Sequence, residues 1–93
     1  MPQHRWMEAD DLKILFIHRF GWENTPMTKQ EIADSIGVSP GSVNFRLGNF
    51  KAIDGVGRAD HIASLSYQVH QKYSGLSLQE LKNLAFGNTG ENT

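Results

Sequence analysis

Small, polar and basic side chains gather between residues 39 and 58, and their chemistry suits contact with nucleic acid. The side-chain amide of Asn44 can make a paired contact with adenine, and the guanidinium of Arg46 can pair with guanine or a phosphate. Small residues at the start of the segment would let backbone amides approach a phosphate. No acidic residue occurs between Gly37 and Ile53. The candidate DNA-binding residues are Ser39, Gly41, Ser42, Asn44, Phe45, Arg46, Asn49, Lys51 and Arg58.

A helix is needed to present these residues, and the sequence predicts one that ends near residue 51. Ser39 is suited to cap its start, and Pro40 fits the first helical position because a proline has no amide to leave unpaired. Apolar residues at helical spacing mark its inward face. These are Val43, Leu47 and Phe50. The outward face is therefore expected to carry Ser42, Asn44, Phe45, Arg46 and Asn49.

Phe45 is large and apolar on a face that should meet water, and two interpretations of it remain open. In the first, its ring contacts the methyl group of thymine or of another 5-methylated pyrimidine, or wedges at a base step. In the second, the ring folds back against the first or the fourth helix. Asn49 and Asp54 also have two interpretations. They could belong to the recognition site, or they could stabilise the fold, with the asparagine capping the helix end and the aspartate starting the next loop.

Another helix is predicted just before this one. Thr28 is suited to be its N-cap, and Glu31 can reach back to the Thr28 amide. Gly37 supplies the left-handed conformation that ends the helix. Four small or branched residues have separations typical of a helix-turn-helix, which we predict over residues 28–50. They are Ala33, Gly37, Val38 and Val43.

Three further helices are expected, and they make the fold all-α. Residues 8–20 have acids in the first turn and His18 and Arg19 in the last, as the helix dipole favours. Their apolar side chains cover more than one stripe, which predicts the central core helix. Residues 59–73 repeat apolar side chains at helical spacing. Ser77 begins a fifth helix that ends by residue 86.

The size and composition of the chain fit one domain. Its 93 residues are 39% hydrophobic, enough for one modest core and too few for two. We predict a single helical domain over residues 1–86 and a flexible tail over residues 87–93. The longest apolar run is four residues, Ile14 to Ile17, far short of a membrane span, so the protein is expected to be cytoplasmic.

The sequence contains no evident group of residues spaced for catalysis or for metal binding. The four histidines lack metal-ligand spacing and are expected at the surface or at helix caps. They are His4, His18, His61 and His70. Asp10 and Asp11 suit a helix N-terminus, and Asp54 and Asp60 flank a glycine-bearing loop. The chain has no cysteine, which excludes disulfides and cysteine-based zinc sites. Because nothing pairs these aspartates with a nucleophile or a base, we expect no enzyme activity, no metal and no small-molecule cofactor.

The segment PGSVNFRLGNFKAID, residues 40–54, resembles part of the helical N-terminal module of bacterial HNH-type restriction endonucleases and related standalone proteins. The resemblance extends over about residues 8–73. Its sharpest positions are Ser42, Val43, Leu47, Asn49, Phe50 and Asp54. It implies a DNA-recognition part of a restriction-type system and no nuclease activity, because the chain has no HNH nuclease motif.

Together, these patterns predict that the chain binds double-stranded DNA in a sequence- or modification-dependent way, within a restriction-type or regulatory system. Lys51 and Arg58 are expected on phosphates. The net charge is only −1, so binding by one copy should be weak, and a homodimer or a tethered nuclease domain would strengthen it. Two alternatives remain: a protein-protein interaction or oligomerisation module that uses the same helix, and a small transcriptional repressor.

Overall fold

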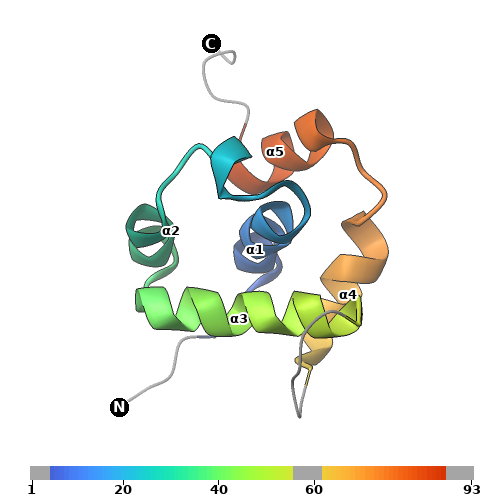
Figure 1. Ribbon diagram of the computed structural model, residues 1–93, viewed down its shortest axis with the longest axis horizontal. Helices are drawn as coiled ribbons and strands as arrows, with labels where there is room; N and C mark the ends of the chain where they lie inside the picture. Colours follow the sequence, from blue (N-terminus) through green and yellow to red (C-terminus); the bar gives the residue numbers. More distant parts are fainter. Residues whose placement is uncertain (1–4, 56–61, 88–93) are drawn as a thin grey trace.

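Five α-helices and one short 3-10 turn form the part of the chain that this computed structural model describes, residues 5–55 and 62–87 (Figure 1). They are α1 (Glu8–Phe20), η1 (Trp22–Asn24), α2 (Lys29–Ile36), α3 (Pro40–Ile53), α4 (Ser64–Tyr73) and α5 (Leu78–Phe86). None of these described residues lies in a strand. The prediction of a compact all-α domain of five helices is confirmed. Of the tail predicted over residues 87–93, all but Gly87 lies outside the described residues.

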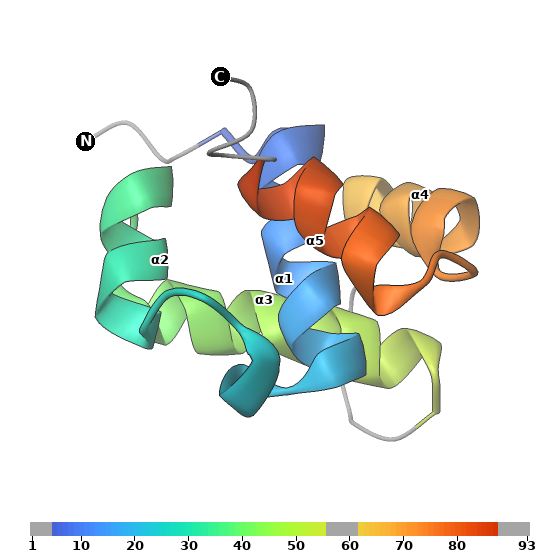
Figure 2. The ribbon, with the colours of Figure 1, turned by 90° about the horizontal axis from the view of Figure 1, so that it is seen from above.

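α1 is the central helix, as its apolar pattern predicted (Figure 1, Figure 2). It packs against α3, α4 and α5. Its buried apolar side chains are Leu12, Ile14, Leu15, Phe16 and Ile17. The ring of Phe16 meets the ring of Phe86 edge-on, with 5.4 Å between centroids. Because apolar side chains point to several sides of α1, one helix can hold three others around it.

The predicted starts of α2 and α5 and the predicted end of α2 are confirmed. The hydroxyl of Thr28 accepts from the Glu31 amide at 3.1 Å, and the Glu31 carboxylate accepts from the Thr28 amide at 2.9 Å. Ser77 and Glu80 repeat this arrangement in α5, and the amide and hydroxyl of Ser77 lower the pKa of Glu80. Gly37 ends α2 in the left-handed region, with φ 95°.

The boundaries of α3 and α4 differ from those predicted. α3 continues to Ile53, beyond the expected end near residue 51. α4 begins at Ser64, whereas helical spacing had suggested a start near residue 59; residues 56–61 lie outside the described part of the chain. The later start has a tertiary cause, because the amide of Ala63 donates to the side-chain oxygen of Asn49 on α3, at 3.3 Å.

Candidate nucleic-acid interface

The connection between α2 and α3 is a tight turn that holds the two helices together. The amides of Gly37 and Val38 both donate to the carbonyl of Ala33, at 2.8 and 2.9 Å. The hydroxyl of Ser39 accepts from the Ser42 amide and caps α3. Apolar side chains join the two helices to the core, including Ile32, Ala33, Ile36 and Val43. α3 therefore runs across the molecule, with one side packed on α1 and the other turned to solvent (Figure 1).

The solvent side of α3 is a stripe that we call the open face. It consists of Gly41, Asn44, Phe45, Gly48 and Lys51. These residues follow one another at intervals of three or four, apart from the neighbours Asn44 and Phe45, so they share one side of the helix. Gly48 is half-buried and the other four are exposed. The open face therefore carries one amide and one ring between two glycines, and one cation beyond the second glycine.

Phe45 is the most exposed large apolar side chain among the described residues, at 82%. The interpretation in which its ring folds against the first or fourth helix is wrong. Val43, Leu47 and Phe50, which were predicted to face inward, are buried. Because they occupy the core side of α3, the ring of Phe45 projects from the opposite side.

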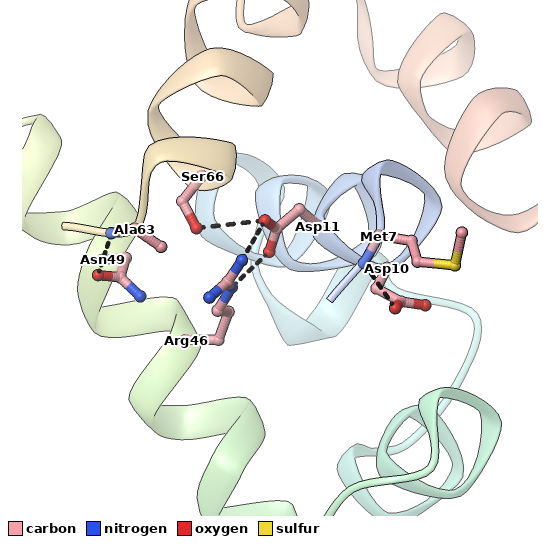
Figure 3. Close-up of polar contacts among 7 residues, drawn as sticks. All are labelled: Met7, Asp10, Asp11, Arg46, Asn49, Ala63 and Ser66. Carbon is pink, nitrogen blue, oxygen red and sulfur yellow. Dashed lines mark hydrogen bonds and ion pairs between the residues drawn. The ribbon is translucent and has the colours of Figure 1, made fainter. Parts of the chain in front are cut away.

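Arg46 does not lie on the outward face, and that prediction is wrong. Its guanidinium donates two hydrogen bonds to the carboxylate of Asp11, each 2.8 Å long (Figure 3). The guanidinium also lies 4.5 Å from the ring centroid of Trp6. The side chain of Arg46 is only 12% exposed, and that of Asp11 is fully buried. A paired, planar guanidinium of this kind holds α3 to the start of α1 and is not available to a base.

Asn49 is also turned inward, so its predicted outward position is wrong. It is 5% exposed, and its side-chain oxygen accepts from Ala63, which ties α3 to the start of α4 (Figure 3). This contact favours the interpretation that Asn49 stabilises the fold. Its partner, however, is the residue before α4 and not the end of α3, which the asparagine was expected to cap.

The remaining candidate DNA-binding residues differ in position and exposure. Ser42 is half-buried, and its hydroxyl lies 3.2 Å from that of Ser39. Ser39 is exposed at the start of α3, and Lys51 is exposed near its end. Arg58 lies outside the described residues. The structure thus brings Gly41, Asn44, Phe45 and Lys51 together on one face and separates them from Arg46 and Asn49.

The buried role of Asp11 was not predicted from the sequence. Asp10 alone serves the start of α1, where its carboxylate accepts from the Met7 amide at 3.0 Å. Asp11 instead accepts from Arg46 and from the hydroxyl of Ser66 on α4, the latter at 3.2 Å (Figure 3). One signal was present: Asp11 precedes Leu15 by four residues and so shares the core side of α1. A carboxylate on that side requires a cationic partner.

A second polar cluster joins α1, the end of α3 and α4. The Nε2 atoms of His18 and His70 lie 2.6 and 2.8 Å from different oxygens of Asp54. Both imidazole side chains are largely buried, 12% and 14% exposed, so they are not surface histidines, although each lies in the last turn of its helix. The hydrogen bond from His18, and secondarily that from His70, lowers the pKa of Asp54 against the opposing effect of desolvation. No metal-binding group of three or more such ligands occurs among the described residues.

Comparison with known proteins adds no identification. No protein-family model, curated protein or solved structure matches the chain. The resemblance of residues 40–54 to a restriction-endonuclease module therefore stays a prediction. In the part of the chain that the structure describes, no helix combines the length and apolar character needed to cross a membrane.

Proposed function

We propose that the chain binds double-stranded DNA through the open face of α3, with α2, the turn at Gly37 and α3 acting as a helix-turn-helix. The observation that carries the proposal is Phe45, whose ring stands 82% exposed between Gly41 and Gly48. An apolar ring held in water forgoes the stabilisation of about 1.5–3 kcal/mol that full burial would give. Such a ring on a narrow helix face suits contact with a thymine methyl group in the major groove.

The two glycines of the open face support close approach of a partner to the helix backbone. A glycine inside a helix is less favourable than alanine by roughly 0.5–1 kcal/mol. The fold does not require Gly48, because a Cβ placed there would meet no atom within 4 Å. At Gly41 a Cβ would meet only the Ser39 hydroxyl oxygen, at 3.8 Å. Close approach of a DNA groove to the helix backbone would explain why glycine occupies both positions.

Charge along α3 also supports the proposal. α3 has no acidic residue from Pro40 to Ile53, and Lys51 is exposed. Its N-terminus carries the partial positive charge of the helix dipole, which favours a phosphate near Gly41. With so few cations, one copy of the chain would bind DNA weakly. A dimer or a tethered domain would strengthen the binding and is part of the proposal. A restriction-type or regulatory system is its proposed setting, and a small repressor would use the same face.

Fluorescence anisotropy with a labelled duplex at about 50 and 200 mM salt tests this function. The apparent Kd should rise steeply with salt, and Lys51→Ala should reduce the slope of log Kd against log salt by about one. Arg46 is unsuitable for this test, because its substitution would break the pair with Asp11. Absence of binding above background, together with a concentration-dependent mass that Phe45→Ala abolishes, would instead establish a protein-interaction module.

Replacement of Gly48 with alanine should separate stability from binding. We expect the free energy of unfolding to rise by roughly 0.5–1 kcal/mol, because alanine favours the helix and the added methyl group meets no protein atom. The same methyl group would hold the DNA away from the backbone, so the Kd should increase about fivefold or more. Chemical unfolding and anisotropy measure the two effects.

Gly75→Ala is the matched control for this variant. Gly75 lies outside α3, and a Cβ there would also meet no atom within 4 Å. Its replacement should leave DNA binding unchanged. A stabilised Gly48→Ala protein that binds DNA as tightly as the unmodified chain would show that α3 does not approach the duplex closely.

A further inference from the structure

We infer that the open face selects A·T base pairs from the major groove: Asn44 recognises adenine, and Phe45 recognises the 5-methyl group of thymine in the neighbouring pair. This recognition rests on the proposed DNA binding and names the class of duplex that is bound. It follows from the side chains that the fold leaves on the open face and from those that it removes.

The fold removes from the open face the side chains that read guanine and cytosine best. Guanine is read by arginine or lysine at O6 and N7, and cytosine by a carboxylate that accepts from its N4 amino group. The only arginine of α3, Arg46, is bound to Asp11 by two hydrogen bonds and is 12% exposed. α3 contains no acidic residue. Its only lysine, Lys51, lies about 10 Å along the helix from Asn44, a position that suits a phosphate.

The two side chains that remain at the centre of the open face match an A·T pair. The side-chain amide of an asparagine accepts from the N6 amino group of adenine and donates to N7. Thymine adds a 5-methyl group, which an apolar side chain can contact and which unmodified cytosine lacks. Asn44 is exposed, and the ring of Phe45 is 82% exposed. Neither side chain has to leave the core to reach a base.

The spacing of these side chains favours two successive base pairs. Asn44 and Phe45 are consecutive, so they diverge by about 100° around the axis of α3. Side chains that diverge in this way reach different base edges, and successive pairs lie about 3.4 Å apart. Gly41 and Gly48 lie about one turn before and after Phe45, so no side chain along the stripe holds the ring away from a methyl group.

Four alternating duplexes of equal length separate the two contacts. They contain A·T pairs, A·U pairs without the methyl group, G·C pairs, and pairs of guanine with 5-methylcytosine, which carry the methyl group without adenine. Anisotropy in one low-salt buffer should give the smallest Kd for A·T. The Kd should be about fourfold larger for A·U, as expected for one buried methyl group. It should be about tenfold larger for the 5-methylcytosine duplex, which lacks adenine, and largest for G·C.

Two variants assign these preferences to their side chains. Phe45→Ala should bind the A·T and A·U duplexes equally and still prefer both to G·C. Asn44→Ala should keep the difference between A·T and A·U and lose the preference for A·U over G·C. Gln68→Ala removes an exposed amide from α4 and is the control that should retain both preferences. Each variant is compared with itself across the duplexes, so an effect of uracil on duplex shape would persist in Phe45→Ala.

Several results would overturn this assignment while leaving DNA binding in place. Equal affinity of the unmodified chain for the A·T and A·U duplexes would remove the methyl contact, and a difference that persists in Phe45→Ala would do the same. Equal affinity for the A·U and G·C duplexes would remove the adenine contact of Asn44. If none of the duplexes is bound above background, the proposed function itself fails, and selection of A·T pairs fails with it.

Discussion

Replacement of Asp11 with alanine is expected to lower the free energy of unfolding by about 3–5 kcal/mol. Asp11 is fully buried and accepts both hydrogen bonds of the Arg46 guanidinium, so its loss leaves a largely buried cation without its partner. The hydroxyl of Ser66 loses its acceptor as well. A loss of this size is a large fraction of the 5–15 kcal/mol that stabilises a typical domain. Urea unfolding followed by the fluorescence of Trp6 and Trp22 measures it.

Two variants serve as controls for the Asp11 prediction. Asp34→Ala removes an exposed carboxylate from α2 and should change stability by less than about 0.5 kcal/mol. The double variant Asp11→Leu with Arg46→Met replaces the pair by apolar side chains and should recover much of the loss, because no unpaired charge is left in the core. An Asp11→Ala protein as stable as Asp34→Ala would contradict the role assigned to this pair.

Replacement of Phe45 with alanine is expected to weaken DNA binding about tenfold or more, as truncation of a central aromatic contact generally does. The thermal stability should hardly change, because the ring is 82% exposed and contributes little to the core. Anisotropy with the duplex used for the unmodified chain gives the change in Kd, and a thermal melt gives the change in Tm. A large loss of binding with an unchanged Tm would locate the contact at the open face.

Tyr67→Ala is the matched control for Phe45→Ala. Tyr67 is an aromatic residue on α4, 52% exposed and outside the open face, so its removal should leave the Kd unchanged. Equal losses in the two variants would indicate a nonspecific effect of surface aromatics. An unchanged Kd in Phe45→Ala would remove the open face from the binding site.

The sequence predicted the helices well because their signals are local. The cap of α2 depends on Thr28 and Glu31, three residues apart, and its end depends on the left-handed conformation of Gly37. The core side of α3 followed from the helical spacing of Val43, Leu47 and Phe50, all of which are buried. Such signals act within one or two turns of a helix, so they can be read before the fold is known.

The flanks of α3 could not be assigned in the same way. Arg46 and Asn49 lie at one edge of the buried stripe, and Asn44 and Lys51 lie at the other. Spacing alone does not tell which edge is covered by other helices. Polar character suggested solvent for all four, whereas the structure covers one edge and leaves the other open.

The sequence by itself determined the five-helix architecture, the tight turn between α2 and α3, and the helix that carries the candidate site. The tertiary structure alone decided which residues of α3 face outward. Arg46 turns inward because its partner Asp11 is 35 positions away in the sequence, and Ser66, which completes that contact, is 55 positions from Asp11. A buried charge takes the partner that the packed helices bring to it. Phe45 remains in solvent because Val43, Leu47 and Phe50 already occupy the core side of the helix.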